Sequence, residues 1–250
     1  MTWLEAVLLG VIQGLAEFLP VSSSGHLVIA QKILGFSAPP VFFDVLVHVG
    51  TLMAVIVYFR DRWLKLTGGQ IKLLVLATVP AVVVGVLLNP VLGDLFNSLW
   101  VVMIGLVITG TLLVMSSGRF SDSGFSIDKM SGKQALLIGL FQALAIMPGV
   151  SRSGSTVVGG VMMGLKKQAA FFFSFFMAVP AILGALVLQL VDNQAFGAVD
   201  SMSLVIGFGV ALVTGLFSLK ILEKVINSSK LNLFAYYCFG LAIVLLVVSL

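Results

Sequence analysis

The stretch FLPVSSSGHLV at residues 18–28 and the related stretch MPGVSRSGSTVV at residues 147–158 decide how this chain folds. Both interrupt apolar sequence with proline, serine and glycine. When the chain is shifted by 129 positions, residues 10–28 align without a gap on residues 139–157, and nine of the nineteen positions are identical. Glutamine, two serines and a glycine are among the identities, and a hydrophobic composition does not explain these. We therefore interpret the two segments as copies of one duplicated unit.

The composition is that of an integral membrane protein. Of 250 residues, 60% are hydrophobic and only 10% are charged, whereas about 25% are charged in a soluble domain. About 20 apolar helical residues cross a bilayer, and stretches of that kind lie at 41–59, 71–88, 99–115, 170–191, 204–222 and 231–250. The sequence predicts an all-α chain with six transmembrane helices in a single membrane domain, residues 1–250. The net charge of +4 comes from basic residues at the span ends, so membrane lipids and not nucleic acid are the expected partners.

Each copy of the duplicated unit predicts a re-entrant helical hairpin. Two apolar stretches, each too short to span, are joined by the polar break, over about residues 3–34 and 134–165. A broken helix is tolerated at membrane depth only where protein or a polar cavity covers the freed backbone groups. Three spans separate the hairpins, so they enter from opposite faces and form an inverted-topology repeat of residues 1–116 and 134–250. Two kinked helices that each span the membrane are the alternative.

The charged loops predict an orientation. Three loops are basic and carry Arg60, Arg62, Lys65 and Lys72, then Arg119, Lys129 and Lys133, then Lys220, Lys224 and Lys230. The loops at 89–98 and 192–203 carry only aspartates as charged residues. Positive loops face the cytoplasm. The first hairpin then enters from outside, the second from the cytoplasm, and the C-terminus lies outside.

Serines at the two breaks suit helix starts, because serine is a favoured N-cap. Simple capping therefore explains some of them. Two half-helix N-termini aimed at one another also concentrate positive dipole and free N–H groups. Gly25 and Gly154 would let a ligand approach this backbone closely. We expect an anion there, and phosphate is the obvious one.

The two copies differ where chemistry would need them to differ. The first carries Glu17, Ser23 and His26 where the second carries isoleucine, Arg152 and serine. Arginine suits bidentate phosphate binding, and histidine can be a general base, a general acid or a nucleophile. Ser23 is a candidate nucleophile if His26 takes its proton, and Glu17 could orient His26 or hold a divalent cation. A Glu17–Arg152 ion pair that only fastens the hairpins together is the structural alternative.

The motifs QGLAE at 13–17, PVSSSGH at 20–26 and PGVSRSGST at 148–156 resemble the signatures of the undecaprenyl-diphosphate phosphatase family, also called the bacitracin-resistance family. Similarity of pattern extends to residues 43–51 and 175–181. The resemblance implies hydrolysis of undecaprenyl diphosphate to undecaprenyl phosphate and phosphate, which recycles the lipid carrier of cell-wall synthesis. It also implies a bacterial cytoplasmic (inner) membrane location, a site open toward the outer face, a divalent cation such as Mg²⁺ or Ca²⁺, and a homodimer.

Carried over residue by residue, the resemblance implies a catalytic set of Glu17, Ser23, His26 and Arg152, with Glu17 also a metal ligand. The expected substrate-binding residues are Gln13, Ser22, Ser24, Gly25, Ser151, Ser153, Gly154 and Thr156. Gln13 stands where many family members have a glutamate, so this position is expected to tune metal or substrate binding. Whether Ser23 or His26 attacks phosphorus stays open, and Ser23 with His26 as its base is preferred.

Inverted repeats with broken helices also occur in transporters, so a transporter or flippase of the polyprenyl phosphate carrier is the alternative function. A phosphatidic-acid-type phosphatase is excluded, because the second half of the chain has no histidine. Asp44 and His48, four residues apart, are interpreted as a satisfied polar pair. The phenylalanines at 171–173 and 175–176 are interpreted as packing, beside lipid or the polyprenyl tail.

Overall fold

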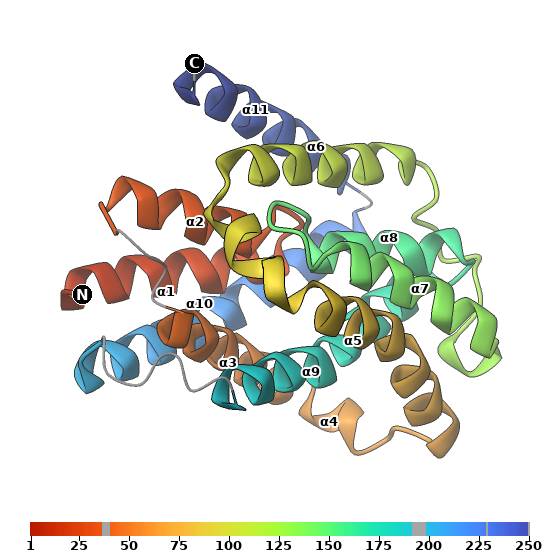
Figure 1. Ribbon diagram of the computed structural model, residues 1–250. Coiled ribbons are helices and arrows are strands. Elements are labelled where there is room, and N and C mark those ends of the chain that lie inside the picture. The colour runs from red at the N-terminus through yellow and green to blue at the C-terminus, as the bar shows by residue number, and fades with distance from the viewer. Residues whose placement is uncertain (37–40, 192–198, 229, 250) are drawn as a thin grey trace.

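The computed structural model of the protein describes residues 1–36, 41–191, 199–228 and 230–249 (Figure 1). Throughout these ranges the regular structure is helical, apart from one isolated bridge between Phe125 and Leu165. The expected all-α class is confirmed for this part of the chain.

The six predicted spans all coincide with helices. Four helices in the described ranges are long and apolar enough to cross a membrane: α5 (Gly68–Asn97), α9 (Lys167–Val191), α10 (Ser201–Asn227) and α11 (Asn232–Ser249). The helices α3 (Val41–Tyr58) and α6 (Leu99–Met115) are apolar but shorter. Pairs distant in sequence pack together, with α1 (Trp3–Phe18) against α10, α10 against α3, and α6 against α11.

One connection differs from the expected loop, and another lies largely outside the described residues. The segment expected as loop 89–98 is helical as far as Asn97, because α5 continues through Pro80 and Pro90 to Ser98, which caps α6. Proline is tolerated inside a membrane helix when neighbouring groups satisfy the freed carbonyl. The expected loop 192–203 begins with residues 192–198, which lie outside the described ranges.

Each duplicated unit folds as a pair of short helices joined by a tight turn. The first pair is α1 and α2 (Ser23–Ile33), and the second is α7 (Gly132–Leu144) and α8 (Arg152–Met162). The longest of the four, α1, has 16 residues and a length of about 24 Å, which is less than the roughly 30 Å of a bilayer core. Figure 1 shows the pairs extending to opposite sides, with their turns together in the centre of the molecule.

The two turns pack directly against each other. A Cβ at Gly25 would lie 3.2 Å from the Cα of Gly149, and one at Gly154 would lie 3.0 Å from the Cβ of Pro20. Gly149 has a φ of +89°, and a Cβ there would lie 2.1 Å from the carbonyl oxygen of Val102 in α6. The open sides of Gly25 and Gly154, expected to face a ligand, therefore face protein.

The aromatic run of α9 lies in the core. Its five phenylalanines at 171–173 and 175–176 are at most 7% exposed. The rings of Phe171, Phe172, Phe175 and Phe176 contact Phe59, and Phe176 also contacts Trp63. This confirms packing as their role and excludes the lipid-facing position.

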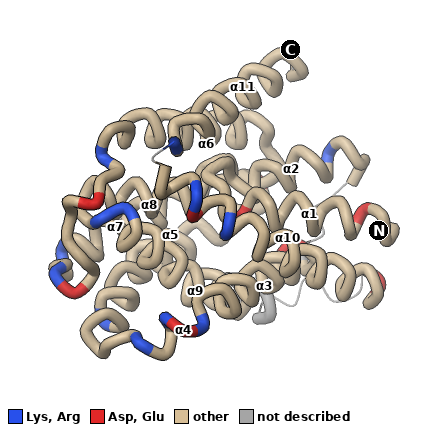
Figure 2. The backbone as a smooth tube through the Cα atoms, turned by 180° about the vertical axis from the view of Figure 1, so that it is seen from behind, with Lys and Arg blue, Asp and Glu red and all other residues tan. Residues whose placement is uncertain are grey.

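Lysine and arginine gather at one end of the molecule. Figure 2 shows them around the short helix α4 (Arg60–Trp63) and the outer end of α7, whereas the end that carries the N-terminus has few. The 3-10 helix η1 (Ile127–Lys129) lies in the basic loop before α7.

Candidate active site

A single buried carboxylate joins the two turns. Glu17, in the last turn of α1, is 7% exposed. Its Oε1 accepts a hydrogen bond from Nη2 of Arg152. Its Oε2 accepts from the hydroxyl of Ser23 at 2.5 Å and from the amide of Gln13 at 3.1 Å. The structure therefore brings together four of the residues that the sequence singled out, from both copies of the duplicated unit.

In the first turn, an unusual backbone conformation brings the chain back toward the carboxylate of Glu17. Ser22 has a φ of +69°, and no other non-glycine residue in the described ranges has a positive φ. Such a conformation costs about 1–3 kcal/mol. The Ser22 side chain caps α2 by accepting from the N–H of Gly25 at 3.3 Å, so α2 starts at Ser23, opposite Glu17.

The second turn is held by α6. The hydroxyl of Thr109 accepts from the N–H of Ser151 at 2.9 Å and donates to the carbonyl of Gly149 at 2.9 Å. The Ser151 side chain caps α8 by accepting from the N–H of Gly154 at 3.1 Å. Arg152 is therefore the first residue of α8. Hydrogen bonds of the N–H groups of Ser151 and Gly154 hold the backbone before and after it.

Each capping serine also lies beside a second serine, in the same arrangement in the two copies. The hydroxyls of Ser22 and Ser24 are 3.2 Å apart, and those of Ser151 and Ser153 are also 3.2 Å apart. Ser153 also donates to the carbonyl of Leu19 at 3.4 Å. The hydrogen bonds from Gly25 and Gly154 confirm capping by Ser22 and Ser151. The bond from Ser153 to Leu19 links the two turns.

Thr156 lies one turn into α8 and points toward α9. Its hydroxyl donates to the carbonyl of Arg152 at 2.8 Å and lies 2.5 Å from the hydroxyl of Ser174. Its described contacts therefore anchor α8 to α9 behind Arg152.

The structure separates His26 from the Glu17 cluster. Nδ1 of His26 lies 2.8 Å from the carbonyl oxygen of Ser22, and Nε2 lies 2.6 Å from the hydroxyl of Tyr237 in α11. In the described residues His26 makes no hydrogen bond to Ser23 or to Glu17. The hydroxyl of Ser23 donates to Glu17 and not to His26.

Two residues of α3 that the sequence did not assign to the site complete it. Nε2 of His48 lies 3.7 Å from Oε2 of Glu17, and the hydroxyl of Thr51 accepts from the amide of Gln13 at 3.4 Å. The carboxylate of Asp44 instead accepts from Gln31 at 2.7 Å, so its side chain is not bonded to His48. For His48 the sequence did carry a signal, because an ionisable side chain inside an apolar span is commonly functional.

Comparison with known proteins determines the family. The model of the bacitracin resistance protein BacA matches residues 6–244. The chain belongs to the BacA family. A relative from Carboxydothermus hydrogenoformans is 38% identical over 98% of this chain and 97% of its own length. One from Rhodopirellula baltica is 40% identical over 97% of both chains, and one from Syntrophotalea carbinolica is 42% identical over 95% of both. All three are named undecaprenyl-diphosphatase.

In this member of the BacA family two buried polar atoms of the site have no partner among the described residues: Nη1 of Arg152 and Oε1 of Gln13. Buried polar atoms are almost always hydrogen-bonded, so both are suited to a ligand. The guanidinium nitrogen can donate to an anion, and the amide oxygen can bind a cation.

The divalent cation that the family resemblance implies would find few protein ligands at this site. No group of three His, Cys, Asp or Glu residues that could hold a metal occurs in the described residues. Glu17 and the free oxygen of Gln13 are nevertheless hard oxygen donors. Mg²⁺ commonly takes one or two carboxylates and completes its shell with phosphate oxygens and water. The residues fit an ion shared with a diphosphate.

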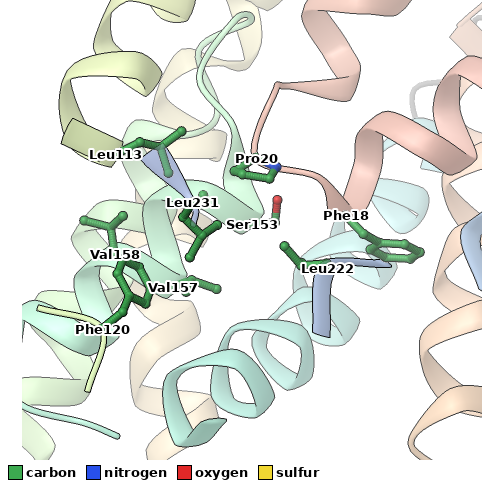
Figure 3. Close-up of a pocket in the computed structure, with 10 residues that line it drawn as sticks. Phe18, Pro20, Leu113, Phe120, Ser153, Val157, Val158, Leu222 and Leu231 are labelled. Atoms are coloured by element: carbon green, nitrogen blue, oxygen red, sulfur yellow. The ribbon is translucent and has the colours of Figure 1, made fainter. Parts of the chain in front are cut away.

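A narrow crevice lies beside the two turns of this BacA family protein, and neither Glu17 nor Arg152 is among its lining residues. Figure 3 shows Phe18, Pro20, Ser153, Val157 and Leu222 among its lining. Ser153 supplies the only polar side chain among its lining residues. Because it carries no charge, this crevice does not suit a diphosphate, and the candidate phosphate site is the Glu17–Arg152 cluster.

Proposed function

We propose that this membrane protein hydrolyses undecaprenyl diphosphate to undecaprenyl phosphate and inorganic phosphate, the reaction that its relatives' names describe. The observation that carries the proposal is the guanidinium of Arg152. One of its terminal nitrogens is bonded to Glu17, and the other is buried without a partner among the described residues. A donor of this kind beside a serine hydroxyl suits a phosphate undergoing attack.

The contacts favour Ser23 as the nucleophile and Glu17 as its base. The Ser23 hydroxyl already donates to Oε2 of Glu17 at 2.5 Å, so the proton passes to this carboxylate as the serine oxygen attacks the terminal phosphorus. The bond to the bridging oxygen breaks, and undecaprenyl phosphate leaves with the electron pair. Protonated Glu17 binds Arg152 less strongly, which frees a second guanidinium nitrogen for the transferred phosphoryl group.

Water then completes the reaction. It attacks the phosphoserine, the serine oxygen recovers its proton from Glu17, and inorganic phosphate leaves. His26 is the remaining general base, because its bond to the Ser22 carbonyl places the imidazole proton on Nδ1 and leaves Nε2 able to accept.

A divalent cation is part of the proposal. Glu17 and Gln13 would hold it together with diphosphate oxygens, and when bound it would offset the negative charge of the substrate. Mg²⁺ and Ca²⁺ both accept such oxygen ligands.

We also propose the inverted repeat and its orientation in the bacterial cytoplasmic membrane. Supporting this, α1 and α2 extend to the side opposite α7 and α8, and the basic residues gather at the end that carries α4 and α7. Positive loops face the cytoplasm, so the first hairpin would be re-entrant from the outer face and the site would open there. The homodimer implied by the family resemblance belongs to the same proposal.

The deciding experiment measures phosphate release from undecaprenyl diphosphate by the purified full-length protein in detergent, with Mg²⁺, Ca²⁺ or a chelator. We expect cation-dependent release, abolished by Ser23→Ala and lowered about 10²–10³-fold by Arg152→Ala. Ser228→Ala is the control and should retain activity, because the exposed Ser228 hydroxyl lies outside the site and bonds to the Val225 carbonyl of its own helix.

A substrate labelled on its terminal phosphate should transfer the label to Ser23. An active Ser23→Ala variant would remove serine as the nucleophile. A folded wild-type protein that releases no phosphate under any of these ions would overturn the proposed function.

A further inference from the structure

Tyr237 reaches the candidate site from a helix that otherwise packs elsewhere. It lies in the second turn of α11, the last helix, which packs mainly against α6 (Figure 1). Its hydroxyl is 2.6 Å from Nε2 of His26 in α2. The two rings are nearly parallel, with 9° between their planes and 5.7 Å between their centres. A residue 211 positions away in sequence therefore contacts the imidazole by both its ring and its hydroxyl.

The two bonds of His26 define its tautomer. Nδ1 faces the carbonyl oxygen of Ser22 at 2.8 Å, and a carbonyl can only accept, so Nδ1 carries the proton. In a neutral imidazole Nε2 then has a free electron pair. Tyr237 must therefore donate its hydroxyl proton to Nε2. Ser22 and Tyr237 together hold the ring with Nε2 as the acceptor.

The segment of α11 around Tyr237 is fixed against the first hairpin. The thiol of the next residue, Cys238, lies 3.6 Å from the carbonyl oxygen of Pro20 and is fully buried. Cys238, Ala242 and Leu245 of α11 pack in one cluster with Val21 and other residues of the first hairpin and α6. The Tyr237 side chain thus starts from a rigid backbone position beside the turn that carries His26.

We propose that Tyr237 connects His26 to the water that attacks phosphoserine. Its hydroxyl accepts a proton from this water while its own proton passes to Nε2 of His26. The proposal rests on the proposed function. Tyr237 acts through His26, so it matters for the hydrolysis of the intermediate and not for the capture of substrate or the attack by Ser23.

The test compares Tyr237→Phe with Tyr236→Phe in the purified full-length protein. Phenylalanine keeps the ring and removes only the hydroxyl. Tyr236 is the matched control, because it is the adjacent tyrosine, is 66% exposed and makes no hydrogen bond within the described ranges. We expect Tyr237→Phe to lower kcat about tenfold, the effect of one hydrogen bond of about 1.4 kcal/mol, and to leave KM within about twofold. Tyr236→Phe should change neither constant.

Two further readouts separate this proton-transfer role from a general structural role. The fraction of enzyme trapped as phosphoserine from terminally labelled substrate should rise in Tyr237→Phe, because only the second step slows. In a His26→Ala background Tyr237→Phe should have no additional effect, since it acts through the imidazole. Wild-type kcat in Tyr237→Phe, or independent effects of the two changes in the double variant, would overturn this inference while leaving the phosphatase proposal standing. An inactive wild-type protein would instead overturn the phosphatase.

Discussion

At the scale of single residues, Arg152 serves two purposes with one guanidinium. Nη2 pairs with Glu17 and Nη1 is left for phosphate. A lysine has the same charge but a single compact ammonium group, which would pair with Glu17 and leave no second donor. We therefore expect Arg152→Lys to lower kcat/KM about 10²–10³-fold, the usual effect of losing one donor to transition-state charge. The rate of phosphate release, measured at a saturating concentration of the cation, gives this kcat/KM. Arg62→Lys, which changes an arginine stacked on Phe172, is the control, and near-normal activity of Arg152→Lys would show that charge alone suffices.

Gln13 gives a second prediction at this scale. Its amide nitrogen donates to Glu17 and Thr51, and its oxygen is buried without a partner among the described residues. Gln13→Glu would add a carboxylate where the cation is proposed, so the Mg²⁺ or Ca²⁺ concentration for half-maximal activity should fall about tenfold. Gln13→Leu removes the oxygen and should raise that concentration. Cation titrations of phosphate release measure both, and unchanged midpoints would place the ion elsewhere.

At the scale of elements, α6 holds the second turn through one hydroxyl. Thr109→Val keeps the shape of the side chain but leaves the N–H of Ser151 without its acceptor. An unpaired buried group costs about 1–3 kcal/mol, so we expect the free energy of unfolding to fall by that amount and activity to fall with it. Thr109→Ser should preserve both. Thr111→Val is the control, because its exposed hydroxyl bonds only to the Val107 carbonyl of its own helix. Denaturation in detergent gives the values, and equal losses for the two valine variants would contradict this role.

The elements also show what the sequence could and could not predict. The two hairpins and the cluster of Glu17, Ser23 and Arg152 followed from the repeat, because proline, glycine and serine breaks are local signals in an apolar chain. His48, Thr109 and Tyr237 could not be placed. Each lies in an apolar helix whose pattern does not reveal which face meets a hairpin, and that face is set by packing between distant segments. The preferred Ser23–His26 pairing also rested on sequence proximity, whereas the positive φ of Ser22 turns Ser23 toward Glu17.

At the scale of the whole molecule, the proposed inverted repeat makes a topological prediction. The connection between α5 and α6 and the connection between α10 and α11 occupy equivalent places in the two halves. A duplicated unit inserted in opposite senses must place them on opposite faces of the membrane. Asp94 lies in the last turn of α5, next to the first connection, and Lys230 lies in the second connection; both are exposed. The basic character of the second connection predicts that it faces the cytoplasm.

Single cysteines can test this, because the chain has one native cysteine, Cys238, and it is fully buried. In intact cells a thiol reagent that cannot cross the inner membrane should label Asp94→Cys and leave Lys230→Cys unlabelled, and permeabilised cells should give labelling of both. The unmodified protein controls for reaction of Cys238. Labelling of both sites in intact cells would contradict the inverted repeat. With a re-entrant second hairpin, the three crossings α6, α9 and α10 separate the two positions and place them on opposite faces. Labelling of Lys230→Cys alone would keep the repeat but reverse the orientation, and the Glu17–Arg152 site would then open toward the cytoplasm.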